Sequence, residues 1–83
     1  MNVSNWIERQ ADFGPERCAI RFAGEDLSYS VIAQKVNRLA DSLANRLDVS
    51  SGDRIAYLGL NTPEMIILLF ACARVGAVLM PLN

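Results

Sequence analysis

Apolar residues recur at helical spacing over residues 29–47, and this is the clearest element that the sequence predicts. Ser28 precedes the helix and is its expected N-cap, because its hydroxyl can accept a hydrogen bond from a first-turn N–H. The polar residues of this segment share one face, which we interpret as solvated; a docking surface is the less favoured alternative. The apolar residues line the opposite face: Ile32, Val36, Leu39, Ala40, Leu43, Ala44 and Leu47.

A shorter helix is predicted at the start of the chain, before the long one. Val3, Trp6, Ile7 and Ala11 share helical spacing, and residues 14–15, Gly-Pro, end the pattern. An exposed tryptophan could serve as a platform for a ligand, but we favour Trp6 as an anchor of the hydrophobic core.

Between the two helices the sequence predicts a β-hairpin. Residues 18–23 and 27–29 are typical of short strands, and residues 24–26 have the composition of a turn. Glu25 and Asp26 would then lie at the hairpin tip. Adjacent carboxylates can perform acid–base chemistry or bind a metal, but at a tip they are more often turn residues, and we favour that interpretation.

The second half of the chain predicts a strand followed by a helix. Residues 54–60 lack polar alternation after Arg54, which is typical of a strand buried on both faces of a parallel sheet. Thr62 can cap the next helix, Pro63 suits its first position, and Glu64 meets the positive end of the helix dipole.

This helix, expected over residues 63–75, is apolar on all sides, and Gly76 is expected to end it in a left-handed conformation. Residues 77–82 are another apolar strand, which completes a βαβ unit. Such a helix and such strands need protein on every side, and the rest of the chain covers about one face. We therefore expect residues 1–83 to be the opening portion of a larger α/β domain.

Composition narrows the possible functions. The 83 residues are 52% hydrophobic and carry a net charge of −1, so the chain buries surface and has no general attraction for nucleic acid or acidic membranes. The chain has no histidine, which excludes histidine-based catalytic triads and His-ligated metal sites within it. Its glycines form neither a dinucleotide fingerprint nor a phosphate-cradling loop.

Cysteine spacing and apolar runs indicate a compartment. Cys18 and Cys72 form no CxxC or zinc pattern, so we expect two free, buried thiols in a reducing cytosol, with a disulfide as the alternative. The first residues have no signal-peptide pattern. Residues 65–73 are apolar but too few to cross a bilayer, and Arg74 interrupts the longer run. We expect a cytoplasmic protein without a transmembrane segment; a peripheral membrane segment over residues 65–82 is a minor alternative.

The order of these motifs resembles the N-terminus of the adenylate-forming (AMP-binding) enzymes, in particular the acyl-CoA synthetases that act on fatty acids. The similarity runs from about Trp6 to Asn83. Val31 and Ile32 depart from the family pattern, which often has an acidic residue and Leu there, and this touches helix capping only. The resemblance is carried by Leu27-Ser28-Tyr29 with Asn37-Arg38-Leu39-Ala40, Ser51-Gly52-Asp53-Arg54-Ile55-Ala56, Leu60-Asn61-Thr62-Pro63-Glu64, and residues 70–83.

The resemblance implies an α/β fold, namely the N-terminal portion of the large domain of an acyl-CoA-synthetase-like fold, with a helix, a β-hairpin, a long helix and a βαβ unit. It also implies a parent enzyme that activates a carboxylic (fatty) acid with ATP and Mg²⁺ and passes the acyl group to CoA. The family's nucleotide-binding and C-terminal domains are expected downstream of residues 1–83.

None of the catalytic or ligand motifs of that family can be placed on this sequence. The one lysine, Lys35, is expected on a solvated helix face, and Ser50-Ser51-Gly52 lacks the content of the family's nucleotide loop. We therefore assign no catalytic, cofactor-binding or metal-binding residue to residues 1–83.

Two functions stay open from the sequence. The first is a scaffold segment of an ATP-dependent fatty-acid–CoA ligase, inactive alone, whose partner is the rest of the parent enzyme. The second is a free-standing small α/β binding or self-assembly module without enzymatic activity. This module would have to cover its apolar faces by self-association, because a core of this size rarely supplies more than about 3–5 kcal/mol.

Overall fold

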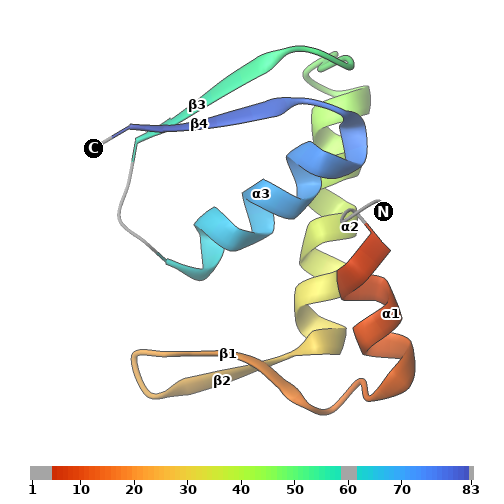
Figure 1. The fold of residues 1–83 in the computed structure, drawn as a ribbon, viewed down its shortest axis with the longest axis vertical. Coiled ribbons are helices and arrows are strands. Elements are labelled where there is room, and N and C mark those ends of the chain that lie inside the picture. Colours follow the sequence, from red (N-terminus) through yellow and green to blue (C-terminus); the bar gives the residue numbers. More distant parts are fainter. Residues whose placement is uncertain (1–4, 59–61, 83) are drawn as a thin grey trace.

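Helices and strands follow one another in the order that the sequence predicts, which confirms the α/β fold class (Figure 1). The computed structural model describes residues 5–58 and 62–82. Val3 of the predicted first helix and residues 59–60 of the predicted strand lie outside the described residues. The elements are α1 (Trp6–Phe13), β1 (Cys18–Phe22), β2 (Glu25–Ser28), α2 (Tyr29–Asn45), β3 (Arg54–Leu58), α3 (Pro63–Val75) and β4 (Val78–Leu82).

The strands form two separate pairs. β1 and β2 are an antiparallel hairpin, whereas β3 and β4 are parallel and are joined by α3. The parallel register runs from Arg54 opposite Val78 to Leu58 opposite Leu82. The predicted βαβ unit is therefore confirmed, and the two strand pairs lie at opposite ends of α2 (Figure 1).

The turn of the hairpin lies one position earlier than the sequence predicts. Ala23 and Gly24 have positive φ angles of 52° and 80°, as in the two-residue turns that match hairpin twist. β2 therefore begins at Glu25, and the prediction that Glu25 and Asp26 occupy the tip is wrong. Asp26 instead pairs across the strands with Arg21, at 2.6 Å between Nε and Oδ1. The sequence favours the later turn because alanine seldom adopts a positive φ.

α2 contributes most of the buried core, and its apolar face is confirmed up to Leu43. Ala44 is exposed, and Leu47 is 68% exposed, although the helical pattern places both on the buried face. The helix ends at Asn45, so Leu47 has left the helical path and no longer shares its face. The buried residues of α2 are Ile32, Ala33, Val36, Ala40 and Leu43.

The helix ends follow local capping chemistry, with one exception. The Ser28 hydroxyl accepts a hydrogen bond from a first-turn N–H of α2 at 3.2 Å, as predicted. Pro63 occupies the first turn of α3, and Gly76 ends it with φ of 79°, also as predicted. The predicted cap by Thr62 is wrong, because its side chain makes no bond to the helix N–H groups and is hydrogen-bonded to the Glu64 carboxylate.

Replacing Ser28 with alanine is expected to lower the free energy of unfolding by about 1 kcal/mol, because a first-turn N–H of α2 loses its acceptor. Urea unfolding followed by the fluorescence of Trp6, the one tryptophan, measures the change. Thr62→Ala is the matched control at the N-cap position of α3, where no such bond exists, and should cost less. Equal losses from the two variants would contradict this account of Ser28.

Trp6 joins the three helices through ring contacts. Its indole meets the Tyr29 ring edge-on at a centroid distance of 5.9 Å and stacks on Phe70 at 6.2 Å. It packs against a core cluster that includes Ile7 of α1 and Ile67 of α3. The interpretation of Trp6 as a core anchor is therefore confirmed. A second cluster, built from Ala40, Leu43, Ala71 and Cys72, connects α2 and α3 near the parallel strands.

Arg74 provides a polar link among the same helices. Its guanidinium lies 2.7 Å from the Glu8 carboxylate of α1 and donates a hydrogen bond to the side-chain oxygen of Asn37 on α2. The Arg74 side chain is only 24% exposed. In the sequence, this residue is visible only as an interruption of an apolar run and as a cation suited to a helix C-terminus.

The two cysteines occupy different environments. Both are free, as predicted, but only Cys72 is buried, and the predicted burial of Cys18 is wrong. Cys18 begins β1 beside an irregularity in the strand pairing, at the edge of a hairpin that is largely exposed. Burial raises the pKa of the Cys72 thiol, which lowers the thiolate fraction that reacts with disulfides.

We expect dithiobis(nitrobenzoate) to modify one thiol rapidly in each folded chain and the second only after denaturant is added. Exposure makes Cys18 the fast site, whereas burial and a raised pKa protect Cys72. Absorbance of the released thiolate counts both phases. The Cys18→Ser variant should lose the fast phase and keep the slow one, and two fast thiols in the native chain would refute the assignment.

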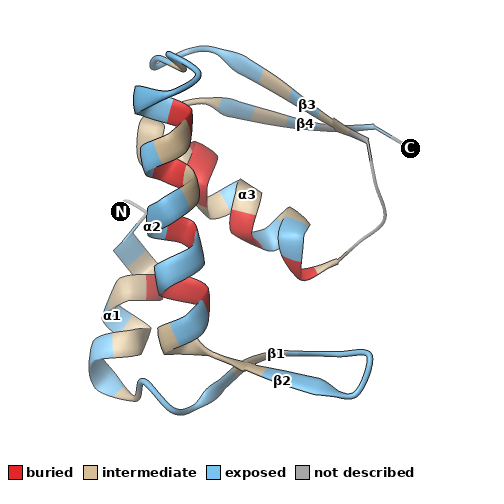
Figure 2. Ribbon diagram, turned by 180° about the vertical axis from the view of Figure 1, so that it is seen from behind, coloured by how far each residue is buried: buried red, intermediate tan, exposed pale blue. Residues whose placement is uncertain are grey.

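Apolar surface stays open on both the parallel strands and α3. Figure 2 shows buried residues concentrated along α2 and α3, while the strands are intermediate or exposed. The double-sided burial predicted for these strands is therefore not found at residues 54–57, 77–80 and 82, all of which are half-buried or exposed. α3 contains the long apolar run, yet no helix in residues 5–58 and 62–82 is both long enough and apolar enough to span a membrane.

Candidate functional site

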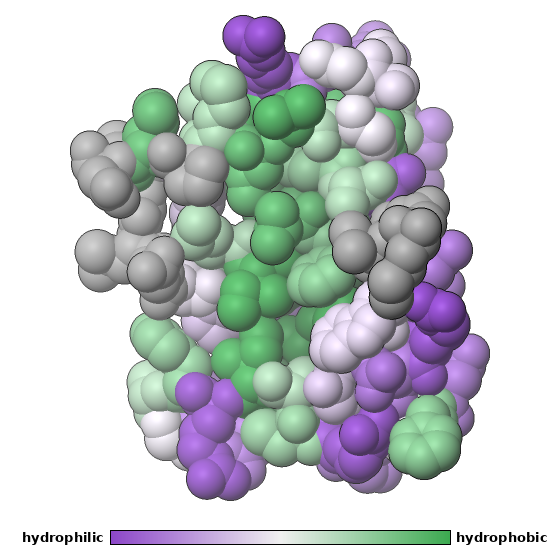
Figure 3. Space-filling model, viewed as in Figure 1, coloured by the Kyte–Doolittle hydropathy of each residue, from purple (hydrophilic) through white to green (hydrophobic). Residues whose placement is uncertain are grey.

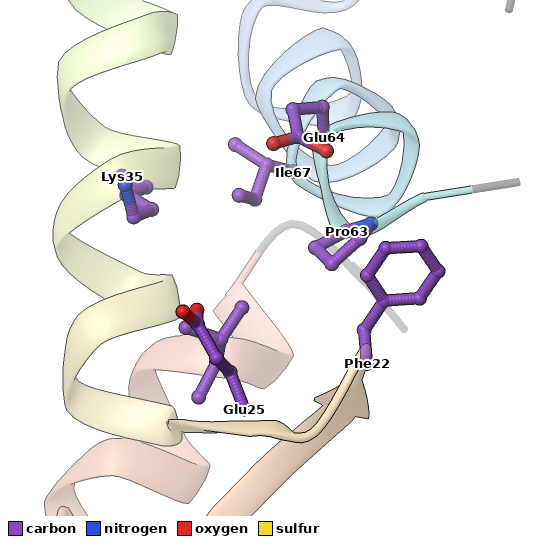
Figure 4. A pocket seen from close by; sticks show the side chains of 7 residues that line it. Phe22, Glu25, Lys35, Pro63, Glu64 and Ile67 are labelled. Atoms are coloured by element: carbon purple, nitrogen blue, oxygen red, sulfur yellow. The ribbon is translucent and has the colours of Figure 1, made fainter. Parts of the chain in front are cut away.

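A hollow of about 240 Å³ opens where the hairpin, α2 and the start of α3 meet. Figure 4 shows charged side chains from β2, α2 and α3 around it. Lys35 is exposed, as expected for a solvated helix face, but it also borders this hollow, which the sequence does not indicate. The lining combines apolar and charged residues: Phe22, Glu25, Leu27, Lys35, Pro63, Glu64 and Ile67.

Glu64 is held in its charged form at this opening. Hydrogen bonds from its own backbone N–H and from the Thr62 hydroxyl, together with the positive charge of Lys35, lower the pKa of its carboxyl group. An exposed carboxylate of this kind stays ionised at neutral pH, so it cannot act as a general acid there. The arrangement stabilises the start of α3, where a negative charge also meets the helix dipole.

We expect the pKa of Glu64 in the folded chain to lie below its ordinary value of 4.5 and to rise in Thr62→Val, which lacks the donating hydroxyl. Because the folded-state pKa is depressed, the stabilisation is complete above the ordinary value and is lost as the pH falls through the folded value. Carboxyl-carbon NMR titration measures the pKa of Glu64 in the unchanged chain and in the variant. Lys35→Gln should give a smaller rise, since its charge is the weakest of the three causes; an unchanged Glu64 in Thr62→Val would contradict this.

The charged residues of the hollow do not fit a magnesium ion. Within residues 5–58 and 62–82, no three His, Cys, Asp or Glu side chains gather into a possible metal site. The carboxylates that line the hollow are Glu25 and Glu64, and the cation Lys35 lines it with them. Mg²⁺ prefers carboxylate oxygens without a competing cation, so these residues offer no suitable donor set.

The Ser50–Gly52 turn is likewise occupied by contacts within the chain. The Ser50 N–H donates to the Asp53 carboxylate at 2.8 Å, and the Gly52 N–H donates to the Gly76 carbonyl at 2.9 Å. A phosphate-binding loop needs N–H groups that are free to face the ligand. This turn therefore does not fit a nucleotide phosphate; it holds the end of α3 beside the start of β3.

A second hollow, of about 280 Å³, lies on the outer side of α3 and is almost entirely apolar. Its lining consists of Thr62, Met65, Ile66 and Leu69. In the view of Figure 1, strongly hydrophobic residues run down the middle of the molecular surface (Figure 3). Such a surface accepts hydrocarbon side chains and offers little to a charged ligand. The described chain thus presents a scaffold with an open apolar side.

Similar proteins identify the family of this scaffold. Residues 7–83 match the family model described as AMP-binding enzyme. The chain belongs to the AMP-binding enzyme family. This match confirms the family that the ordered motifs indicate. Those motifs run from Leu27-Ser28-Tyr29 to the segment ending at Asn83.

Relatives named as CoA ligases or CoA synthases resemble this chain along nearly its whole length. It is 51% identical over 83 residues to the indoleacetate–CoA ligase of Aromatoleum aromaticum, covering 100% of this chain and 16% of that protein. It is 42% identical over 81 residues to a feruloyl-CoA synthase of Amycolatopsis sp, covering 98% of this chain and again 16% of the relative. The chain therefore spans about one sixth of the length of these relatives.

Solved structures of AMP-binding enzymes contain the same arrangement. A protein described as a long-chain-fatty-acid CoA ligase from Rhodopseudomonas palustris superposes with a TM-score of 0.92 at 36% identity, covering 100% of this chain and 21% of that one. The N-terminal subdomain of Klebsiella oxytoca NpsA superposes with a TM-score of 0.88 at 28% identity, covering 99% and 21%. The predicted N-terminal portion of an acyl-CoA-synthetase-like large domain is thus confirmed.

The sequence does not predict two pairs of charged side chains that helix packing brings to the same place. Lys35 and Glu64 line the same hollow from α2 and α3, and Arg74 pairs with Glu8 across α3 and α1. The only local signal is that Lys35 and Arg74 are cations in otherwise uncharged or apolar stretches. Their partners lie on other helices, so only helix packing reveals them.

Proposed function

We propose that residues 1–83 are the N-terminal scaffold segment of an ATP-dependent, AMP-forming acid–CoA ligase. The observation that supports this most strongly is the 51% identity, over all 83 residues, to a CoA ligase of which they make up 16%. In this proposal residues 1–83 are a partial α/β domain, and the nucleotide-binding and C-terminal domains lie downstream. ATP, Mg²⁺ and CoA bind to those other parts, and residues 1–83 contribute no catalytic, cofactor or metal ligand.

The parent's substrate is a carboxylic acid that becomes an acyl-adenylate and then a thioester of CoA. The motif resemblance and the Rhodopseudomonas palustris structure favour a fatty acid. The names of the two CoA-forming relatives favour indoleacetate or ferulate as a second candidate class. The free thiols of Cys18 and Cys72 favour a reducing compartment, so we place the parent enzyme in the cytoplasm.

The test is a chimera in which this chain replaces the aligned segment of the indoleacetate–CoA ligase. If residues 1–83 are a scaffold of this enzyme class, the chimera should fold and exchange pyrophosphate into ATP in the presence of indoleacetate. The host ligase without its aligned segment should be inactive, as should the isolated 83-residue chain. Exchange activity in the isolated chain would refute the assignment of the catalytic machinery to other parts.

The same experiment addresses the free-standing module. An inactive chimera, together with an isolated chain that is a stable monomer and melts cooperatively, would favour a small independent module and overturn the ligase proposal. A tight oligomer of the isolated chain beside an inactive chimera would favour self-assembly, which is the module's other form.

A further inference from the structure

The hollow of about 240 Å³ between the hairpin and α3 has the form of a small ligand site. Such sites are concave and largely apolar, with a few polar groups that converge from different elements. The apolar floor is made by Leu27 of β2 with Pro63 and Ile67 of α3, and the last two are buried. Charged side chains reach the rim of the hollow from β2, α2 and α3 (Figure 4). The hollow therefore joins a hydrocarbon surface to a charged rim.

The rim has one negative charge that no positive charge balances. Glu25, Glu64 and Lys35 contribute two carboxylates and one ammonium, a net charge of −1. Within residues 5–58 and 62–82, none of these three side chains takes part in an ion pair. The Thr62 hydroxyl and the N–H of Glu64 itself already hold the Glu64 carboxylate in place. A positively charged ligand would therefore meet one fixed carboxylate and one that has no ion-pair partner.

The Phe22 ring forms a wall of the hollow that also favours a cation. Phe22 is opposite Glu25 in the hairpin register, is 46% exposed and lies beside Pro63 (Figure 4). The face of an aromatic ring attracts an ammonium group, and the ring also packs against methylene groups. An anion fits poorly, because the start of α3, whose dipole would attract it, already carries the Glu64 carboxylate.

We propose that this hollow binds a small organic monocation, namely a primary ammonium group on a short hydrocarbon chain. The ammonium group has three N–H donors and no acceptor, which suits the Glu25 and Glu64 carboxylates, and the hydrocarbon chain lies on the apolar floor. One ammonium group balances the net charge that Lys35 leaves on the rim. The inference is independent of the proposed function, which assigns ATP, Mg²⁺ and CoA to other parts of the polypeptide.

The test is an NMR titration of the isotopically labelled chain with n-butylammonium chloride. We expect saturable shifts of the backbone amide signals of residues 22–27 and 63–67, which surround the hollow. Butanol and butyrate have the same hydrocarbon chain without the positive charge, and they should bind about two- to fivefold more weakly or less. Ammonium chloride, which lacks the chain, should also bind more weakly, because it leaves the apolar floor uncovered.

Three substitutions test the role of the rim. Glu25→Gln removes one carboxylate at nearly constant size and should weaken n-butylammonium binding by about two- to fivefold. Glu16→Gln is the matched control, because Glu16 is exposed and does not line the hollow. Lys35→Gln should strengthen binding by a similar factor, since it removes the repelling charge. A cation that responds only to the net charge of the chain would be weakened equally by Glu25→Gln and Glu16→Gln, and that result would overturn the inference.

An absence of saturable shifts in the folded chain would overturn it as well. If the isolated chain gives the amide spectrum of an unfolded polypeptide, binding is measured by saturation-transfer difference on the chimera with the indoleacetate–CoA ligase. A weaker signal in Glu25→Gln than in Glu16→Gln would then support the site, and equal signals would overturn it. Nα-acetyl-lysinamide carries the same ammonium chain on a peptide unit. Tighter binding of this probe than of n-butylammonium would identify a lysine side chain as the ligand, weaker binding would identify a free amine, and either result supports the site.

Discussion

Replacing Ile32 with alanine is expected to lower the free energy of unfolding by about 2–5 kcal/mol, the largest single effect that the structure predicts. Ile32 is fully buried in the cluster that joins α1, α2 and α3, and the shorter side chain leaves a cavity there. A core of this size supplies only about 3–5 kcal/mol, so the isolated variant should be largely unfolded at room temperature. Urea unfolding followed by Trp6 emission provides the measurement, because Trp6 packs on the same cluster.

Val31→Ala is the matched control for Ile32→Ala. Val31 is the preceding residue of the same helix, also β-branched, and is 37% exposed. Its truncation removes little buried surface and should change the free energy of unfolding by no more than about 0.5 kcal/mol. Alanine is the better helix former at both positions, so helix propensity cannot produce a loss; if the two variants were equally destabilised, the core position of Ile32 would be refuted.

Gly76→Ala is expected to cost about 2–4 kcal/mol, from two separate causes. Gly76 has φ of 79°, a conformation in which a residue with a Cβ is strained. A Cβ at this position would also lie 2.9 Å from the Ser51 Oγ and 3.3 Å from the Ser51 Cα, so the turn before β3 would have to move. Thermal and urea unfolding of the variant measure the combined loss.

Gly24→Ala separates the two causes, because Gly24 has φ of 80° but no heavy atom within 4 Å of an added Cβ. This control carries the backbone strain alone, about 1–2 kcal/mol. The excess loss in Gly76→Ala is then the contact with Ser51. A Gly76→Ala variant no less stable than Gly24→Ala would show that the turn at Ser51 yields freely and would contradict the close approach of the two segments.

Local chemistry explains why the element order is readable from the sequence. Ser28, Pro63 and Gly76 act on backbone groups within a few residues, so their effects do not depend on the rest of the fold. The predictions that are wrong concern positions where a second local interaction or conformation competes with the expected one. Thr62 bonds to a nearby carboxylate in place of the helix N–H groups, and Ala23 accepts a positive φ to begin the hairpin turn.

The candidate sites depend on tertiary packing more than the order and the ends of the helices and strands do. Lys35 and Glu64 line one hollow only because α2 and α3 pack together, and Arg74 reaches Glu8 only because α1 and α3 pack into the same cluster with α2. Cys18 is as apolar a residue as Cys72, yet one is exposed on a hairpin and the other is buried between helices. No periodic pattern distinguishes these pairs, because burial is a property of the neighbours.

The sequence by itself determined the helices, the strands, the βαβ connection and the excess of apolar surface, since each follows from periodicity and capping within a short window. Its ordered motifs also determined the family. The tertiary structure decided which apolar residues are covered and which stay open, with Leu79 directed into the core and Met80 away from it. That choice depends on where α3 and α2 pack against the strands, and contacts between distant segments are not encoded in any local pattern.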